Sequence, residues 1–320
     1  MSDSNTPIAI IGAGSIGERY IRNLWQLGYR NLVVFRQRNL PFRDISDATV
    51  KVVTTWDELL AARPYAAFVC TPTAMHLPQT QALVENKIHV LVEKPLSHSV
   101  EGWEELSTAV AKNKVYVHVG YMMRHHPILA HIKGLMAQNT YGKLVSIQSK
   151  WGEYLPDWHP WEDYRTSYAA RKALGGGVAL TLSHDLDMVN WLADSPVEQW
   201  FIMKNYASTL ELDVEAGADI LLRYAGGCTA NVHLNYYEKN KERFLKLVFD
   251  DASVSVDFFD STLTITQHAV KEVLRFENFD RNDLFVNQIK HFLAKTTQFS
   301  PKEVEEQIAA SHLIISICNG

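Results

Sequence analysis

A glutamate, a lysine and a proline follow one another at positions 93–95, directly after the apolar run VLV. Lysine can accept or donate a proton, and a lysine partly shielded from water gives up its proton more readily than one in bulk water. Pro95 would fix the backbone after Lys94 and favour an extended conformation at that lysine. An isolated Glu93–Lys94 surface pair would contribute under about 1 kcal/mol and no chemistry. The other motifs of the chain favour proton transfer over a simple ion pair.

A glycine-rich loop, IGAGSIGERY, places Gly12, Gly14 and Gly17 in the spacing G-x-G-x-x-G. The loop follows the apolar run IAII and precedes a helical pattern, which is the context of dinucleotide-binding loops. Gly12 would allow the tight turn, Gly14 the approach of a pyrophosphate, and Gly17 close helix–strand packing. The helix N-terminus at Ser15 and Ile16 would offer N–H groups to phosphates. The stretch predicts a dinucleotide site; the alternative is a glycine turn with only a packing role.

The residues after the second apolar run, LVVF, indicate which dinucleotide is preferred. An NAD site usually has an acidic residue there to bind the ribose 2′-hydroxyl, whereas this chain has Arg36 and Arg38. A charge-assisted hydrogen bond to a 2′-phosphate contributes about 1.5–3 kcal/mol, so one arginine could favour NADP about tenfold to a hundredfold. We therefore predict NADP in preference to NAD. The alternative is that these arginines belong to a solvated basic surface.

The first 122 residues alternate strand-like runs with helical stretches, which is typical of a parallel sheet covered on both faces. We expect strands at 8–11, 32–35, 50–53, 66–70, 89–92 and 115–119, separated by helices that include 17–28, 56–62, 77–87 and 100–112. The stretches CTPTAMH, VEKPLS and GYMMRHHP follow the fourth, fifth and sixth strands. In a doubly wound sheet all three lie at the carboxyl edge, where ligands bind.

Taken together, these motifs resemble the Gfo/Idh/MocA oxidoreductases, and the similarity extends over essentially the whole chain. The resemblance implies that Lys94 sits beside the nicotinamide and transfers the proton of the reacting hydroxyl. It also implies a set of cofactor-binding residues in the same stretches: Thr71, Pro72, His76, Glu93, Lys94 and Arg124. A lone histidine after a strand is more often structural, which is the alternative for His76.

A second signature of this family is similar to GGGVALTLSHDLDMVNWL at 175–192, but this chain departs from it. If one residue is missing after the glycines, His184 and Asp187 match and Thr181 replaces the expected Asp. Without the gap, Thr181 and Asp185 occupy the Asp and His places. We prefer the gapped alignment, in which His184 assists Lys94 and Thr181 makes a family-type Lys/Asp/His relay doubtful. A hydrogen-bonded core histidine is the alternative.

The stretch 151–177 is rich in tryptophan and tyrosine, and aromatic platforms beside polar groups suit sugar rings. We predict the following substrate residues here and in the second signature: Trp158, His159, Trp161, Tyr164, Arg165, Arg171, Thr181 and Asp185. Arg165 and Arg171 could meet a carboxylate or phosphate, as on a sugar acid or nucleotide sugar. The segment resembles family members encoded among surface-polysaccharide genes. The alternative is that the tryptophans fill the loop's own core.

After residue 122 the pattern predicts a second domain. We expect helices at 127–138 and about 178–193, a run of consecutive strands over 197–276, and closing helices at 283–295 and 301–317. The predicted fold is an α/β chain with an N-terminal Rossmann doubly wound parallel sheet (1–122) and a C-terminal α+β domain with a large, mostly antiparallel sheet (123–320). Helices can cover one face of that sheet, so the other face, with apolar residues alternating along 213–260, would form a homodimer or homotetramer interface.

Composition limits the function further. The net charge of −5 is not typical of a nucleic-acid-binding protein, and no apolar run is long enough to cross a membrane. Three widely spaced cysteines show neither a disulfide framework nor metal-ligand spacing, and no secretory signal begins the chain. We expect a cytoplasmic protein without a metal site.

These observations predict an NADP-preferring oxidoreductase that acts on a carbinol or ketone of a sugar or sugar derivative. Two alternatives stay open. One is a glycosidase of the same fold that keeps NAD tightly bound. The other is a non-catalytic, NADP-binding sensor, which the departure at Thr181 makes credible.

Overall fold

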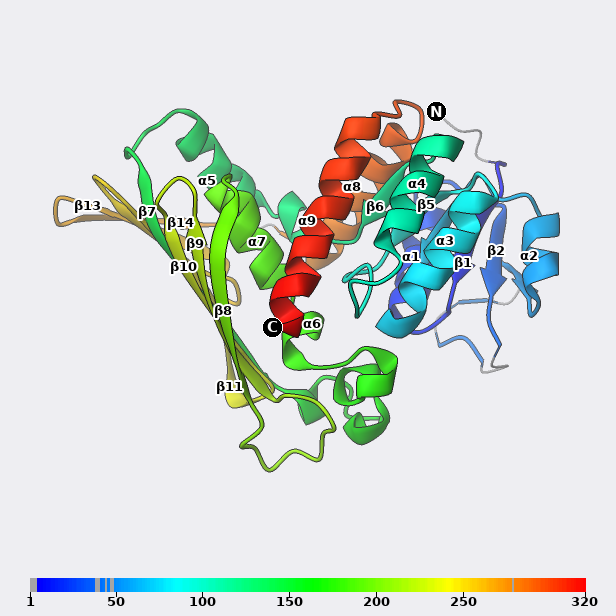
Figure 1. The fold of residues 1–320 in the computed structure, drawn as a ribbon, viewed down its shortest axis with the longest axis horizontal. Helices are drawn as coiled ribbons and strands as arrows, with labels where there is room; N and C mark the ends of the chain where they lie inside the picture. The colour runs from blue at the N-terminus through cyan, green and yellow to red at the C-terminus, as the bar shows by residue number, and fades with distance from the viewer. Residues whose placement is uncertain (1–4, 38–40, 44, 47–48, 278) are drawn as a thin grey trace. The chain divides into compact units, whose positions relative to one another are not determined.

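The structure is a computed structural model that describes residues 5–37, 41–43, 45–46, 49–277 and 279–320. The chain forms two compact units (Figure 1). Unit 1 comprises the residues up to Gly120 together with Asn282–His312, and unit 2 comprises Tyr121–Arg281 with Leu313–Gly320. Each unit has its own sheet.

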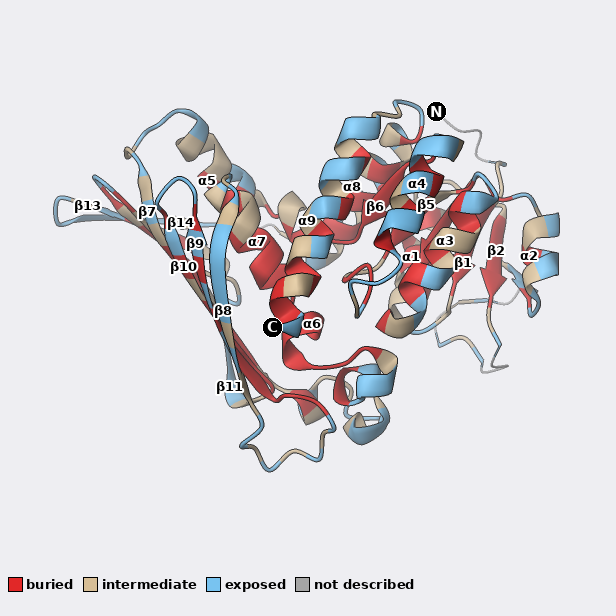
Figure 2. Cartoon of the chain, in the orientation of Figure 1, coloured by how far each residue is buried: buried red, intermediate tan, exposed pale blue. Residues whose placement is uncertain are grey.

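The sheet of unit 1 is parallel, with strand order β3-β2-β1-β4-β5-β6. Every residue of β1, β2 and β4 is buried, so both faces of the sheet are covered. Figure 2 shows the labelled strand β2 in the colour of buried residues. The predicted doubly wound parallel sheet is therefore confirmed. Its strands are β1 (Ile8–Ile11), β2 (Leu32–Phe35), β3 (Lys51–Val53), β4 (Ala66–Val69), β5 (His89–Val92) and β6 (Val117–Val119).

Helices from both ends of the chain cover this sheet. They are α1 (Ser15–Gln26), α2 (Trp56–Ala61), η2 (Thr73–Met75), α3 (His76–Glu85), α4 (Trp103–Asn113), α8 (Arg281–Lys295) and the first part of α9 (Pro301–Asn319).

The two C-terminal helices are divided between the units differently from the prediction, which placed all residues after 122 in one domain. Residues Asn282–His312 belong to unit 1. Phe285 and Phe292 of α8 pack against Tyr20 and Phe68, at ring-centroid distances of 5.9 and 5.5 Å. These apolar contacts assign α8 to unit 1, and the boundary between the units falls inside α9, after His312. The periodicity of a helix shows that it has an apolar face but does not identify the sheet that this face covers.

Unit 2 is built on an eight-stranded sheet with the order β14-β13-β12-β11-β7-β10-β9-β8. All pairs are antiparallel except β7 with β10, so the predicted mostly antiparallel sheet is confirmed. Its strands are β7 (Leu144–Tyr154), β8 (Val197–Asn205), β9 (Gly217–Tyr224), β10 (Thr229–Asn235), β11 (Tyr237–Phe249), β12 (Ser253–Asp257), β13 (Thr262–Gln267) and β14 (Val270–Arg275).

The helices of unit 2 are short apart from two. They are η3 (Met122–His125), α5 (Pro127–Ala137), η4 (Leu155–Asp157), η5 (Tyr164–Thr166), η6 (Tyr168–Ala170), η7 (Lys172–Leu174), α6 (Val178–Thr181) and α7 (His184–Ala193). Within the described residues no helix is long and apolar enough to cross a membrane.

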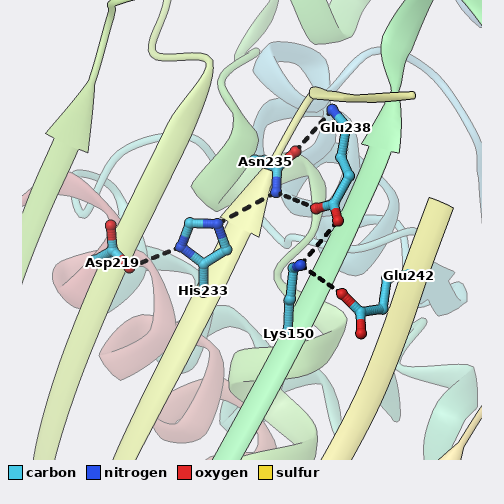
Figure 3. A network of polar contacts seen from close by, with 6 residues as sticks. All are labelled: Lys150, Asp219, His233, Asn235, Glu238 and Glu242. Atoms are coloured by element: carbon cyan, nitrogen blue, oxygen red, sulfur yellow. Dashed lines mark hydrogen bonds and ion pairs between the residues drawn. The ribbon is translucent and has the colours of Figure 1, made fainter. Parts of the chain in front are cut away.

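One face of this sheet is packed against α6 and α7, and the other carries a polar network. The covered face takes the buried apolar residues of the strands between the two edge strands, such as Ile220, Val232 and Leu247. Figure 3 shows six polar side chains joined across β9, β10, β7 and β11 on the other face: Asp219, His233, Asn235, Glu238, Lys150 and Glu242. Gly152 makes room for this network, because a Cβ there would lie 2.0 Å from Glu238 Oε2.

This arrangement differs from the expected second face, on which apolar residues of 213–260 were predicted to alternate. Most of those apolar side chains lie on the covered face. Three exposed apolar residues of the other face, Phe201, Met203 and Leu221, lie together at the β8 edge.

Candidate functional site

The glycine loop of unit 1 has the geometry that a dinucleotide pyrophosphate requires. Gly12 has φ +90°, and its N–H donates to Phe35 O at 2.9 Å. A Cβ at Gly17 would lie 2.1 Å from the carbonyl oxygen of Gly12, so the third glycine permits α1 to pack on the loop. A Cβ at Gly14 would meet nothing within 4 Å, which leaves this side of the loop open to a ligand. The loop therefore fits a dinucleotide.

The N-terminus of α1 follows this loop directly. Gly14 is its N-cap, and no described side chain caps the helix. Ser15 and Ile16 form the first turn, whose N–H groups have no partner within the helix. An uncapped helix N-terminus with its positive dipole end favours a phosphate.

The loop after β4 lies beside the glycine loop. Cys70 N donates to Ile11 O at 2.8 Å, and a Cβ at Gly12 would lie 3.0 Å from Thr71 Cγ2. Thr71 Oγ1 donates to Gln79 Oε1 at 2.7 Å, and Pro72 is the residue before η2. Because the strand order reverses between β1 and β4, this loop lies at the switch point where ligands bind such sheets.

His76 joins two of the carboxyl-edge loops. Its Nδ1 lies 2.7 Å from Pro95 O and its Nε2 lies 2.7 Å from Thr71 O. Burial is the main cause that lowers the pKa of His76, and the two carbonyls partly oppose it. Both ring nitrogens face the backbone, so His76 positions the loops after β4 and β5.

The Glu93-Lys94-Pro95 segment follows β5. Glu93 Oε1 accepts a hydrogen bond from Tyr20 at 2.7 Å, and Oε2 accepts one from Lys94 N at 3.3 Å. Burial raises the pKa of Glu93, and the Tyr20 hydrogen bond and the charge of Lys94 oppose this. The Lys94–Pro95 peptide bond is cis, and Pro95 is buried. The carboxylate of Glu93 is thus turned toward Tyr20.

Arg36 is placed at the end of β2, as predicted. Its N–H donates to Val53 O at 3.2 Å, and its guanidinium carbon lies 4.1 Å from the centre of the Phe42 ring. The ring holds the guanidinium by a cation–π contact. The second predicted arginine, Arg38, lies outside the described residues.

In unit 2, His184 begins α7 between two aromatic rings. The Trp151 ring lies 6.5 Å from the imidazole at an interplanar angle of 29°, and the Tyr121 ring lies 6.0 Å away at 79°. The predicted single helix over 178–193 is wrong, because α6 ends at Thr181 and α7 starts at His184. Thr181 and His184 therefore do not share one continuous helix face.

Asp185 is held by two groups of the covered sheet face. Arg243 donates to its Oδ2 at 2.6 Å and Ser149 donates to its Oδ1 at 2.8 Å. The Arg243 guanidinium lies 3.9 Å from the centre of the Trp151 ring. Sequence reasoning missed Arg243, although it shares the inward register of Leu245 in the alternation of RFLKLVF.

Arg124 and Asp187 form a bidentate ion pair within unit 2. Arg124 Nε and Nη2 donate to the two carboxylate oxygens at 3.0 and 2.6 Å. Burial raises the pKa of Asp187, and Arg124 opposes this. The predicted cofactor residue Arg124 thus has a carboxylate partner inside its own unit.

One part of the Trp-rich loop packs against the sheet, and another part is exposed to solvent. Trp158 contacts the Tyr236 ring edge-on at 5.5 Å, whereas Trp161 is 67% exposed and contacts His159 at 5.3 Å. Trp158 Nε1 and His159 Nδ1 are buried without a hydrogen-bond partner among the described residues. Such groups call for an explanation, and a polar ligand is one.

The two arginines of this loop have acidic neighbours. Arg165 donates to Asp163 at 2.9 Å and to Glu211 at 3.2 Å, and Arg171 lies 3.7 Å from Asp213. Tyr164 accepts a hydrogen bond from Glu211 N at 3.1 Å. The positive charge predicted for an acidic substrate is therefore compensated locally.

The last glycine of the run before α6 is required because a side chain there would clash with Glu215, which is distant in the sequence. A Cβ at Gly177, where φ is +108°, would lie 2.5 Å from Glu215 Oε1, which accepts a hydrogen bond from Ala179 N at 3.1 Å. Glu215 was not predicted, because only the fold brings it to the start of α6. Among the described residues no His, Cys, Asp and Glu group could hold a metal ion.

The glycine loop, the doubly wound sheet and the carboxyl-edge loops define unit 1 as a Rossmann-type dinucleotide-binding unit. Residues 6–121 match the model of an oxidoreductase family with an NAD-binding Rossmann fold, and residues 129–255 match the GFO/IDH/MocA C-terminal domain. The chain therefore belongs to the Gfo/Idh/MocA oxidoreductase family.

Two relatives are similar to this chain at low identity. The oxidoreductase YrbE of Bacillus subtilis (strain 168) is 29% identical over 208 residues, which cover 59% of this chain and 54% of that protein. The myo-inositol dehydrogenase Hyg17 of Streptomyces leeuwenhoekii is 27% identical over 196 residues, 60% of this chain and 57% of that protein. The chain thus spans little more than half the length of these curated relatives.

A solved structure shares the fold. Levoglucosan dehydrogenase in complex with NADH superposes with a TM-score of 0.83 at 14% identity, covering 98% of this chain and 95% of that chain. This likeness concerns the fold alone.

Proposed function

We propose that this protein is an NAD(P)-dependent oxidoreductase that transfers a hydride between a nicotinamide cofactor and a carbinol or ketone of a sugar or sugar derivative. The observation that carries the proposal is the position of Lys94. It follows β5 at the carboxyl edge of a Rossmann sheet, one strand away from the loop that adjoins the glycine loop. Family membership supports the same chemistry.

The nicotinamide dinucleotide binds at the glycine loop and at the loop after β4. Gly12, Gly14 and the first turn of α1 receive the pyrophosphate, and Thr71 and Pro72 line the adjoining loop. NADP is preferred to NAD, because Arg36 occupies the place at which an NAD site has a carboxylate. When bound, the nicotinamide accepts or supplies the hydride.

Lys94 handles the proton in this proposal. A hydroxyl that loses a hydride from its carbon must also lose its proton, and a lysine amine is a suitable base. Glu93 precedes Lys94 and turns its carboxylate toward Tyr20, so the two side chains have different tasks. His184, which Trp151 and Tyr121 orient from two sides, assists proton transfer or binds the substrate.

The substrate is an uncharged sugar or polyol. The buried Trp158 Nε1 and His159 Nδ1 offer polar contacts that hydroxyl groups satisfy, and the exposed Trp161 offers an apolar ring face. Acidic neighbours compensate Arg165 and Arg171, which argues against a sugar acid. The relative Hyg17 is named for an uncharged cyclitol, which supports this class.

Lys94→Ala tests the proposal. The protein and the variant are titrated with NADPH and NADH by fluorescence and then assayed against a panel of sugars and polyols. We expect NADPH to bind at least about tenfold more tightly than NADH, with both affinities retained in Lys94→Ala. We expect turnover to fall by about two to four orders of magnitude in the variant, because its general base is gone.

Lys112→Ala, at an exposed position on α4, is the matched control and should behave as the original protein. Undiminished turnover in Lys94→Ala would contradict the role of this lysine. Equal affinity for the two cofactors would contradict the NADP preference alone.

We also propose that the protein assembles as a homo-oligomer through the second face of the unit 2 sheet. Phe201, Met203 and Leu221 are 59%, 60% and 53% exposed and form an apolar patch on β8 and β9. Exposed apolar patches of this kind are typical of association surfaces.

A further inference from the structure

Three side chains of unit 1 that are far apart in the sequence form a series of hydrogen bonds that ends at Glu93, the residue before Lys94. Gln288 of α8 donates from Nε2 to the Tyr20 hydroxyl at 2.8 Å. Tyr20 of α1 donates to Glu93 Oε1 at 2.7 Å. Tyr20 and Gln288 are fully buried. The proposed cofactor contacts and proton transfer assign no role to either residue.

The hydrogen bonds from Gln288 through Tyr20 to Glu93 have a defined donor-to-acceptor direction. The Gln288 amide nitrogen can only donate, so it occupies a lone pair of the Tyr20 oxygen. The single hydroxyl proton of Tyr20 then points to Glu93 Oε1, which accepts it, and this hydrogen bond favours the carboxylate form of Glu93. Burial raises the pKa of Tyr20 well above its ordinary value, so the phenol keeps this proton. Gln288 Oε1 has no partner among the described residues, so the amide contributes its Nε2 donor to these hydrogen bonds.

The charge of Glu93 matters because Lys94 is its neighbour. The other Glu93 oxygen accepts from Lys94 N, so the carboxylate also fixes the backbone that carries the lysine. The groups that face Glu93 are Arg19 and Tyr20 from α1, Cys70 after β4, and Lys94 itself. Tyr20 donates a side-chain hydrogen bond to Glu93.

We propose that Gln288 and Tyr20 are positioning residues that keep Glu93 an inward-facing carboxylate and thereby set the proton affinity and orientation of Lys94. The inference rests on the proposed function, in which Lys94 transfers the proton. It adds that helix α8, near the C-terminal end of the chain, tunes this step through two hydrogen bonds. A charge-assisted hydrogen bond to a carboxylate is strong enough for this role.

The structure contains a matched control for the test. Gln307 Nε2 donates to the Tyr116 hydroxyl at 2.9 Å, and Tyr116 donates to Glu303 Oε1 at 3.1 Å. This second Gln–Tyr–Glu arrangement also lies in unit 1, but it does not include the Glu93-Lys94-Pro95 segment. Tyr116→Phe therefore removes an equivalent hydroxyl and leaves the hydrogen bonds among Gln288, Tyr20 and Glu93 unchanged.

The test compares Tyr20→Phe, Gln288→Leu and Tyr116→Phe with the original protein. Phe keeps the ring contacts of Tyr20 with Phe68 and Phe285, so the variant retains its packing. Two quantities are measured: kcat, KM and cofactor affinity in steady state, and the pH midpoint at which Lys94 reacts with acetic anhydride, read by peptide mass spectrometry. The second readout does not require a substrate.

We expect Tyr20→Phe to lower kcat on the order of tenfold, with KM and NADPH affinity within about twofold. The labelling midpoint of Lys94 should move to lower pH by roughly half a unit or more, because a less stabilised Glu93 carboxylate holds the ammonium less firmly. Gln288→Leu should give a smaller change in the same direction, since Tyr20 still donates. Tyr116→Phe should leave both readouts unchanged.

Equal labelling midpoints in Tyr20→Phe, Tyr116→Phe and the original protein would contradict the proposal that Tyr20 sets the proton affinity of Lys94, whatever the turnover. A protein that turns over no sugar or polyol refutes the proposed function instead. In that case the labelling midpoints still decide whether Tyr20 and Gln288 set the proton affinity of Lys94.

Discussion

At the scale of single residues, His126 is a histidine that its surroundings keep neutral. It is 3% exposed, caps α5 by accepting from Ile128 N at 3.2 Å, and contacts the Phe258 and Phe279 rings. Burial, with the nearby charge of Arg243, lowers its pKa to about 4. The neutral imidazole is therefore the form that the fold accommodates.

This burial predicts a pH dependence of stability. The unfolded chain protonates His126 near pH 6.5, whereas the folded chain resists until about pH 4. The contribution is therefore complete above pH 6.5 and is lost as the pH falls toward 4, by up to about 3 kcal/mol. In His126→Asn, which keeps a capping acceptor but cannot be protonated, urea unfolding at pH 7, 6 and 5 should show a shallower loss.

His98→Asn, at an exposed position, is the comparison variant and should retain the steeper loss. Parallel pH curves for the original protein and His126→Asn would contradict the assignment.

Several site residues could be predicted from the sequence because each motif requires its residue types locally. Gly12 has φ +90° and Gly17 leaves no room for a Cβ, so their spacing, between an apolar run and a helical pattern, indicated the loop. Tyr20, Gln288 and Arg243 could not be found in this way. Their partners are 73, 268 and 58 residues away, and only the tertiary fold pairs them.

At the scale of elements, the first turn of α7 is fastened to the sheet by a buried ion pair. Asp185 is fully buried and Arg243 nearly so, and Ser149 satisfies the second carboxylate oxygen. Breaking such a pair leaves an uncompensated buried charge. The pair therefore holds the helix that begins with His184.

We predict that Arg243→Met lowers the free energy of unfolding by about 3–5 kcal/mol, as measured by urea denaturation. The double variant Arg243→Met with Asp185→Leu should recover much of this loss, because no charge remains buried. Lys133→Met is the control, since its ion pair with Asp194 at the other end of α7 is exposed and contributes under about 1 kcal/mol. A loss no larger than that of the control would contradict the argument.

Elements were predictable where one pattern dominates. The strands β1, β2 and β5 have the predicted bounds, because their apolar runs are buried on both faces and end at polar or glycine residues. β14 falls at the end of the run of strands predicted over 197–276, although VKEVLR is mostly exposed. The break between α6 and α7 was missed because the apolar period continues through Leu182.

At the scale of the whole molecule, the apolar patch of Phe201, Met203 and Leu221 predicts association. In Phe201→Glu the patch acquires a charge that desolvation in an interface would penalise. Light scattering after size exclusion should then give a mass close to one 36.3 kDa chain, whereas the original protein should give a multiple. Val270→Glu, on the opposite edge strand β14 at 71% exposure, should leave the mass unchanged. A single-chain mass for the original protein would contradict the proposal.

The assignment of α8 to unit 1 also affects how the chain folds during synthesis. Phe292 and Gln288 complete the core around Phe68 and Tyr20, yet they are translated long after the sheet strands that they cover. At about 5–20 residues per second, a ribosome needs roughly 10 to 35 s to add the intervening residues. For that interval the nascent sheet has one apolar flank uncovered, so premature termination before α8 would release an N-terminal chain prone to aggregate or to be captured by chaperones.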